Sequence, residues 1–266
     1  MLTELHGKGG RICPAALEGK QRCPLIIRPT SEDVITGNLC EVLRTLNSRW
    51  WLSDLLNLAL GAHRFPRQFH RHLNIEPWRN RPCYPREFLP WDEGSTQIDL
   101  TIRWENPPTT VYVEMKYGSP VSEKTAGDNG RHGYPSDQLI RNTRVGLMEC
   151  GWFQQGHLFR IPPRDYVLLL CWPNKGHPLV ERYRDAGELR RWIPHSDRLI
   201  GLPATPFIGE LSYRDVIQVF RRQRRWFARP ERAMIDSLID YLVFKTRTVP
   251  RIPPSRQTGI SFSGEQ

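Results

Sequence analysis

Residues 98–117 read IDLTIRWENPPTTVYVEMKY, and this stretch is expected to form the centre of the fold. Two runs of alternating apolar and polar residues flank a short Pro-containing turn, which is the pattern of a β-hairpin. If Asn106 and Pro107 form the middle of the turn, pairing is symmetric about them and Asp99 faces Glu114. Opposed Cβ atoms in such a pair lie about 4.5–5.5 Å apart. Two carboxylates held this close predict a site for a divalent cation.

The alternative for this hairpin is an ordinary solvated face, on which Asp, Glu and Lys are common. Lys116 follows Glu114 by two residues and lies on the same face of its strand. Its positive charge is expected to keep both carboxylates ionised. The spacing alone does not separate a metal site from a solvated face, so the choice depends on the rest of the chain.

Size, composition and charge limit the classes of protein. The chain has 266 residues, 39% of them hydrophobic, and 9 Trp, which predicts a folded protein with a sizeable core. No apolar run reaches the length of about 20 residues that a membrane span needs, and no signal peptide is recognisable, so a cytoplasmic protein is expected. The six cysteines contain no C-x-x-C pair, which argues against a zinc knuckle. A net charge of +10 favours a polyanionic partner, nucleic acid above all.

The order of periodic segments predicts an α/β fold. The expected core elements are a helix at 30–47, a second helix at 53–62, an extended segment at 69–78, the hairpin, a helix at 136–150 and a buried strand at 165–172. This order gives a core with a central mixed sheet. Beyond it we expect a helix at 180–192, a short strand at 197–202 and helices at 212–227 and 230–245. The chain is thus divided into an irregular arm (1–29), a core (30–175), a mostly helical basic extension packed on it (176–246) and a flexible tail (247–266).

The first helix carries a candidate third acid. At about 100° per residue, Glu32 falls within the apolar stripe of this helix, whereas Glu41 lies on the opposite side. Thr30 or Ser31 is expected to cap the helix. A carboxylate on the buried face needs a partner, and a metal ion beside the hairpin would serve. The alternative is an ordinary acid in a first helical turn, and the two interpretations stay open.

Two later helices carry candidate binding residues. On the helix at 136–150, Gln138, Arg141 and Asn142 cluster on one face, and Arg141 is a candidate for contact with nucleic acid. The helix at 212–227 carries four arginines next to aromatic residues, namely Arg221, Arg222, Arg224 and Arg225. Such clusters suit phosphate contact and base stacking, although a basic solvated face is the alternative. The Gly-rich segment 118–134 could close over a substrate, and plain disorder is the alternative.

These motifs together resemble the PD-(D/E)xK nuclease superfamily, whose core is α-β-β-β-α-β. The matching segments are Q-I-D-L-T-I around Asp99 and V-Y-V-E-M-K-Y around Glu114 and Lys116. S-E-D-V-I-T-G-N-L with Glu32 resembles the first helix of some members, and D-Q-L-I-R-N with Gln138 resembles the later helix. The chain departs from the family in having no Pro before Asp99, at a position that varies among members.

The resemblance covers about residues 30–172 and implies a restriction-endonuclease-like fold and a metal-dependent nuclease. It implies that Mg²⁺, with Mn²⁺ as a substitute, is held by Asp99, Glu114 and the backbone carbonyl of Met115, with Glu32 binding directly or through water. Oxygen ligands of this kind suit Mg²⁺. Lys116 would orient the attacking water or stabilise the transition state. Gln138 would hydrogen-bond near Lys116 or that water.

The implied reaction is the hydrolysis of phosphodiester bonds in nucleic acid, with DNA as the expected substrate. A role in prokaryotic defence, a homodimer and a protein partner that regulates cleavage are further expectations from the resemblance. The competing hypothesis is a non-catalytic nucleic-acid-binding or assembly subunit on the same fold. A serine hydrolase has little support, because the chain lacks the G-x-S-x-G motif.

Overall fold

A computed structural model describes the chain except for residues 1–31, 83–88, 90–92, 122–133, 154–161 and 248–266. The first half contains α3 (Glu32–Thr45), the 3-10 helix η2 (Ser48–Trp50), α4 (Leu52–Leu60), β1 (Asn74–Arg81), β2 (Thr96–Glu105), β3 (Pro108–Met115) and α5 (Gln138–Glu149). The second half contains β4 (Asp165–Trp172), α6 (Pro178–Arg184), α7 (Ala186–Arg191), η5 (Ser196–Arg198), β5 (Ile208–Ser212), α8 (Tyr213–Gln223), η6 (Arg224–Trp226) and α9 (Arg229–Arg247). The expected N-terminal arm, the cap at Thr30 or Ser31, most of the Gly-rich segment and nearly all of the tail lie outside the described residues.

The strands form one five-stranded mixed sheet in the order β1-β2-β3-β4-β5. β1, β2 and β3 are antiparallel neighbours, whereas β3, β4 and β5 run parallel. This confirms the expected mixed sheet and the order of helix, three strands, helix and strand. The hairpin pairs with a further strand on each side, and its two faces are buried in two cores, with Leu100 and Val113 in one and Ile98 and Tyr112 in the other.

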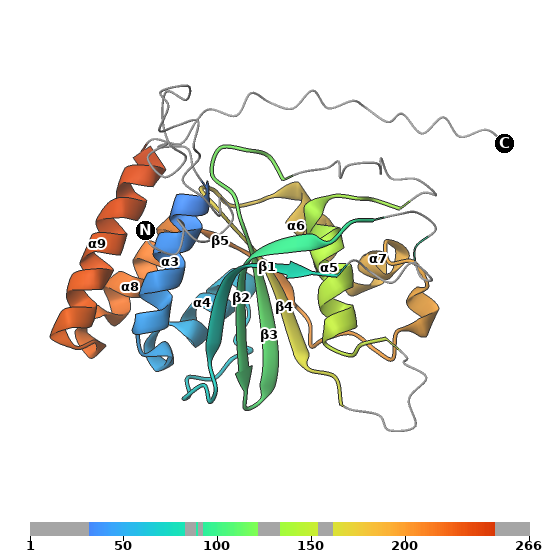
Figure 1. The fold of residues 1–266 in the computed structure, drawn as a ribbon, viewed down its shortest axis with the longest axis horizontal. Coiled ribbons are helices and arrows are strands. Elements are labelled where there is room, and N and C mark those ends of the chain that lie inside the picture. The colour runs from blue at the N-terminus through green and yellow to red at the C-terminus, as the bar shows by residue number, and fades with distance from the viewer. Residues whose placement is uncertain (1–31, 83–88, 90–92, 122–133, 154–161, 248–266) are drawn as a thin grey trace, which may run out of the picture.

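Helices cover both faces of the sheet (Figure 1). α3, α4, α8 and α9 pack against one face, and α5, α6 and α7 pack against the other. β4 shows how the sequence supports two cores, because Val167, Leu169 and Cys171 join the first core while Tyr166 and Leu168 join the second. Its unbroken apolar run predicted such a strand, covered on both sides.

The extension beyond the predicted core completes the sheet rather than only packing on it. β5 pairs in parallel with β4, and α8 follows it directly from a capping box formed by Ser212 and Asp215. The short strand expected at 197–202 is wrong, because that segment forms η5 and a single bridge between Leu199 and Phe153. The helix expected at 180–192 divides at Asp185, whose side chain accepts a hydrogen bond from the backbone of Glu188 and caps α7.

Gly146 allows α5 to pack closely on the sheet. A Cβ atom at this position would overlap the ring of Tyr166, which is fully buried and donates a hydrogen bond to the carbonyl of Asn142. We expect Gly146→Ala to lower the free energy of unfolding by about 1–3 kcal/mol, the usual cost of overpacking a core. Urea denaturation followed by circular dichroism measures this effect. Gly94→Ala is the matched control, because its Cβ would meet nothing within 4 Å, and an equal loss in both variants would contradict the expectation.

Among the described residues, no helix is long and apolar enough to cross a membrane.

Candidate metal and phosphodiester site

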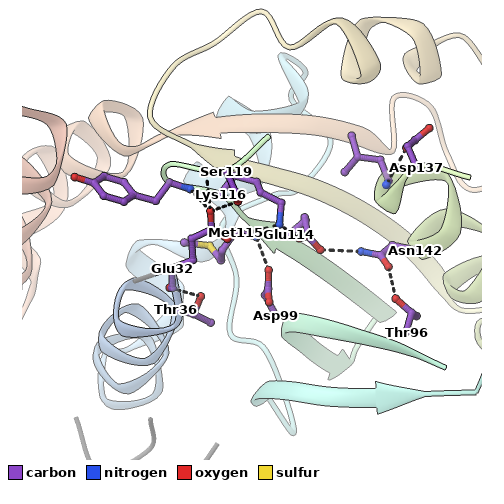
Figure 2. Close-up of polar contacts among 12 residues, drawn as sticks. Glu32, Thr36, Thr96, Asp99, Glu114, Met115, Lys116, Ser119, Asp137 and Asn142 are labelled. Carbon is purple, nitrogen blue, oxygen red and sulfur yellow. Dashed lines mark hydrogen bonds and ion pairs between the residues drawn. The ribbon is translucent and has the colours of Figure 1, made fainter. Parts of the chain in front are cut away.

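The hairpin places two carboxylates where β2 and β3 separate. The pairing of β2 with β3 is symmetric about Asn106 and Pro107, as predicted, and it ends at Leu100 opposite Val113. Just beyond that pair, the Asp99 carboxylate accepts a hydrogen bond of 2.9 Å from the backbone N–H of Met115 (Figure 2). The side chain of Asp99 therefore accepts a hydrogen bond from the main chain at the point where the strand pairing ends.

This face of the hairpin is buried, so the solvated-face interpretation is wrong. Asp99 is 6% exposed and Glu114 is 0% exposed. The same face also buries Thr101 and Tyr112. A buried carboxylate is stable only with hydrogen bonds or a charge partner, and the neighbours of Glu114 supply both.

Glu114 is held from two sides. Lys116 Nζ lies 2.6 Å from Oε1, and Asn142 Nδ2 donates a hydrogen bond of 3.1 Å to Oε2. Thr96 donates in turn to Asn142 Oδ1 at 3.0 Å, which orients the amide so that its NH₂ group faces the carboxylate. Figure 2 shows this chain of three residues running from β2 through α5 to β3.

Burial and the charge of Asp99 raise the pKa of Glu114 to about 8, despite the opposing effect of Lys116. The direction of this shift opposes the prediction that Lys116 keeps Glu114 ionised. The physical reason is that a second anion and complete desolvation together outweigh one ammonium group. Two carboxylates in one buried site favour either a shared proton or a bound cation.

Lys116 remains a cation in this environment. Burial alone would lower its pKa, but the negative charges of Glu114, Glu32 and Asp99 outweigh burial and raise it. Its backbone is fixed as well, because its N–H donates to the carbonyl of Cys171 at 2.9 Å. The ammonium group can therefore donate hydrogen bonds to an anion, but it cannot accept a proton at neutral pH.

Glu32 reaches the edge of the site from the first turn of α3. Its Oε1 accepts hydrogen bonds from the backbone N–H of Tyr117 at 2.9 Å and the hydroxyl of Ser119 at 2.6 Å. Its Oε2 lies 3.8 Å from Lys116 Nζ. The predicted position on the buried side of α3 is confirmed, and Glu41 instead pairs with Arg44 at the surface. The main contact of Glu32 is with the segment that follows β3.

The arrangement of carboxylates fits a cation held by Asp99 and Glu114 better than one held by Asp99, Glu114 and Glu32. In the described part of the chain, no group of three His, Cys, Asp or Glu residues lies close enough to hold one ion. The geometry thus gives no support to Glu32 as a direct ligand. Asp99 and Glu114 provide hard oxygen donors of the type that Mg²⁺ prefers, with water and main-chain oxygen completing the shell. At this position the backbone N–H of Met115 donates to Asp99, and the side chain of Met115 is buried.

The residue that α5 brings to the site is Asn142 and not Gln138. Gln138 begins the helix and is only partly buried, and its side chain forms no hydrogen bond with the described residues of the site. Asn142 lies one turn later and is fully buried. A signal for Asn142 exists in the sequence, since it falls among the apolar positions Leu139 and Ile140 that face the sheet.

The predicted nucleic-acid-binding arginines divide into two groups. Arg141 is not at the open surface, because its guanidinium lies 3.1 Å from Glu93 and donates to the carbonyl of Gly94. The four arginines Arg221, Arg222, Arg224 and Arg225 are all exposed, at the end of α8 and in η6. Arg222 pairs with Asp54 and Arg224 with Asp236.

The C-terminal helices hold the segment directly after β3 in place, a feature that the sequence did not reveal. The hydroxyl of Tyr213, the first residue of α8, donates to the carbonyl of Lys116 at 2.6 Å. The hydroxyl of Tyr117 donates to the carbonyl of Lys245 near the end of α9, and Lys245 Nζ lies 4.5 Å from the Tyr117 ring centroid. The main chain of Lys116 and the side chain of Tyr117 are thereby fixed by residues 97 and 128 positions away.

Comparisons of the chain with protein-family models, with curated proteins and with solved structures gave no match.

Proposed function

We propose that this protein is a metal-dependent nuclease that hydrolyses phosphodiester bonds in nucleic acid, with DNA as the substrate. The observation that carries the proposal is the buried pair of Asp99 and Glu114 with Lys116 Nζ 2.6 Å from Glu114. A protein that only needed stability would gain by replacing such a site with apolar residues. The resemblance to the PD-(D/E)xK nucleases supports the same assignment.

In this proposal Mg²⁺ is held by Asp99, Glu114 and the backbone carbonyl of Met115, and Mn²⁺ can substitute for it. When bound, the ion supplies charge neutralisation on the phosphate and increases the acidity of water. The Lys116 ammonium donates hydrogen bonds toward the negative charge that grows on the phosphate oxygens, which is where a fixed cation lowers the barrier. Asn142 keeps Glu114 in place, a role in which such supporting residues are commonly needed.

A basic groove on the C-terminal helices supplies the proposed contact with the phosphate backbone. It has a volume of about 680 Å³, lies between α8 and α9, and is lined by Arg214, Arg221 and Arg222 together with Ile217, Gln218, Val243 and Thr246. α8 begins at Tyr213, which is hydrogen-bonded to the carbonyl of Lys116. Arg214, which lines the groove, directly follows Tyr213 in the chain, and the arginines of the groove suit a chain of phosphates.

The pathway is proposed from the resemblance alone. We propose a role in prokaryotic defence against foreign DNA, with cleavage controlled by a homodimer contact or by a regulatory partner.

A non-catalytic nucleic-acid-binding subunit is the second candidate function. It is favoured by the fact that both oxygens of Glu114 already have partners, Lys116 and Asn142. In such a protein the raised pKa of Glu114 would reflect a proton permanently shared with Asp99 rather than a site that binds a cation.

Cleavage assays distinguish these two functions. Purified protein is incubated with linear duplex, supercoiled circular and single-stranded DNA, in Mg²⁺, in Mn²⁺ and in EDTA. A nuclease produces new fragments or nicks only with the metal. Binding to DNA without cleavage of any of the three substrates would favour the non-catalytic subunit.

Asn142→Ala tests the support given to Glu114. We expect the rate of Mg²⁺-dependent cleavage to fall about 10- to 100-fold, the usual effect of removing a residue that orients a metal ligand. Gln138→Ala is the matched control on the same helix and is expected to cut within about twofold of the parent protein. Single-turnover cleavage measures both rates, and a larger loss for Gln138→Ala would restore the role predicted for it from sequence.

A further inference from the structure

At the far end of α3 from the site, five side chains form a continuous stack. Arg49 Cζ lies 4.9 Å from the ring centroid of Phe69 and 4.9 Å from that of Trp50. The rings of Trp50 and Trp226 are stacked with centroids 5.3 Å apart and planes inclined by 13°. Arg225 Cζ lies 4.9 Å from the centroid of Trp226. We call this set, Phe69, Arg49, Trp50, Trp226 and Arg225, the aromatic–arginine ladder.

The ladder is assembled from three separate parts of the chain and is open to solvent. Trp50 lies in η2, Phe69 lies between α4 and β1, and Trp226 lies in η6. Phe69 is 65% exposed and Trp226 is 48% exposed, and they are two of the four large hydrophobic residues exposed in the described part of the chain. Contiguous exposed aromatic surface of this kind commonly marks an interaction site.

The charge around the ladder favours an anionic partner. Its nearby acids are already engaged, since Asp54 pairs with Arg67 and Arg222, and Asp236 pairs with Arg224. Neither ladder arginine, Arg49 or Arg225, forms an ion pair with any residue that the structure describes. A protein partner with an apolar patch would match the rings but leave these two charges uncompensated.

We propose that the aromatic–arginine ladder is a binding site for unpaired nucleotides of a single-stranded nucleic acid. Unstacked bases have exposed faces that stack on aromatic rings and guanidinium planes, and their phosphates pair with arginine. Trp50 and Trp226 already stack on each other, so the positions open to a base are the two exposed ends of the ladder, Phe69 and Arg225. A duplex offers only its backbone here, because its base faces are covered by its own stacking. This inference rests on the proposed action on nucleic acid, and it specifies the substrate class as DNA with a single-stranded segment.

One continuous single strand of nucleic acid can span the distance between the ladder and the proposed catalytic site. α3 spans Glu32, at the edge of the site, to Thr45, just before η2. Its 14 residues correspond to a length of about 20 Å at about 1.5 Å per residue. At about 3.4 Å per stacked nucleotide, that length corresponds to about six nucleotides. Figure 1 shows the start of α9 beside the C-terminal end of α3 at this end of the molecule.

Binding measured without cleavage tests the proposal. The full chain in EDTA is titrated into fluorescein-labelled dT20 and into a labelled 20-base-pair duplex, and fluorescence anisotropy gives each Kd. We expect Phe69→Ala to raise the Kd for dT20 about tenfold, since loss of one stacked base costs about that much. Trp226→Ala is expected to raise the same Kd because it removes the ring against which Arg225 lies. The Kd for the duplex is expected to change less than about twofold. Phe244→Ala is the control, an exposed aromatic on α9 outside the ladder.

Several results would overturn the proposal. An unchanged Kd for dT20, or equal losses for dT20 and duplex, would show that the ladder does not select unpaired bases. If sedimentation shows a dimer that both variants convert to monomers while dT20 binding is retained, the ladder is an interface between copies of this chain. Thermal melting checks that the variants fold. If Trp226→Ala does not fold, Phe69→Ala still tests the proposal. Because EDTA prevents cleavage in this assay, selective loss of dT20 binding would stand even if the parent protein proved inactive as a nuclease.

Discussion

Asp99→Asn is expected to abolish Mg²⁺-dependent cleavage while making the metal-free protein more stable. Loss of one of two carboxylate ligands removes several kcal/mol of transition-state stabilisation, which corresponds to a rate loss of about a thousandfold or more. The stability gain has a separate cause. Asn retains an oxygen that can accept the hydrogen bond from the backbone N–H of Met115, but it removes the negative charge that raises the pKa of Glu114.

Single-turnover cleavage and thermal melting in EDTA at pH 8 measure the two effects on one preparation. Gln97→Asn is a matched control, because it changes the polar side chain two residues earlier on the same strand, outside the site. A variant that cuts as fast as the parent protein would remove Asp99 from the metal site. A variant that is less stable than the parent at pH 8 would mean that the two carboxylates do not repel one another.

The second large effect is a pH-dependent stabilisation by Mg²⁺. The pKa of Glu114 is raised from 4.5 to about 8 in the folded protein. Folding therefore favours the protonated form, and this contribution to stability is present below pH 4.5 and is lost as the pH rises to about 8. Mg²⁺ needs the ionised carboxylate, so its binding competes with protons below pH 8 and is strongest above it.

We thus expect the metal-free protein to lose stability between pH 5 and pH 8 and Mg²⁺ to restore it. With free Mg²⁺ about 100 times its Kd, the gain is about 2.7 kcal/mol, or about 5–10 °C in Tm for a protein of this size. Differential scanning fluorimetry in EDTA and in Mg²⁺ across this pH range gives both curves. Asp99→Asn serves as the control, and we expect no Mg²⁺-dependent shift in it. An equal shift in that variant would place the ion elsewhere.

Local patterns were sufficient to predict the elements whose buried residues recur at the period of a strand or a helix. The alternation around Asp99 and Glu114 predicted the hairpin and its register, and the apolar run at 165–172 predicted β4. The position of Glu32 on α3 followed from the helical period alone. These predictions depended on contacts between neighbours in sequence or on a single face of an element.

The features that the sequence did not reveal depend on contacts between distant segments. β5 has only five residues and includes Gly209, whose backbone packs against Ala59 of α4, so its pairing with β4 is decided by tertiary structure. Asn142 falls among the apolar positions of α5, but its partner Glu114 lies 28 positions away on β3. The stacking of Trp226 on Trp50 joins residues about 180 positions apart. No local periodicity contains that information.

The most direct test of the proposed site is the ratio of two cleavage rates, that of the parent protein over that of Lys116→Ala, at saturating Mg²⁺. Lys116 is not a proposed metal ligand, so the variant is expected to keep its stabilisation by Mg²⁺ while losing the ammonium group that lies 2.6 Å from Glu114. Removing one such fixed donor usually lowers a rate by about 10²–10³, and we expect a ratio in that range or above. A ratio near one, with Mg²⁺-dependent cleavage in both proteins, would show that the chemistry takes place at another site.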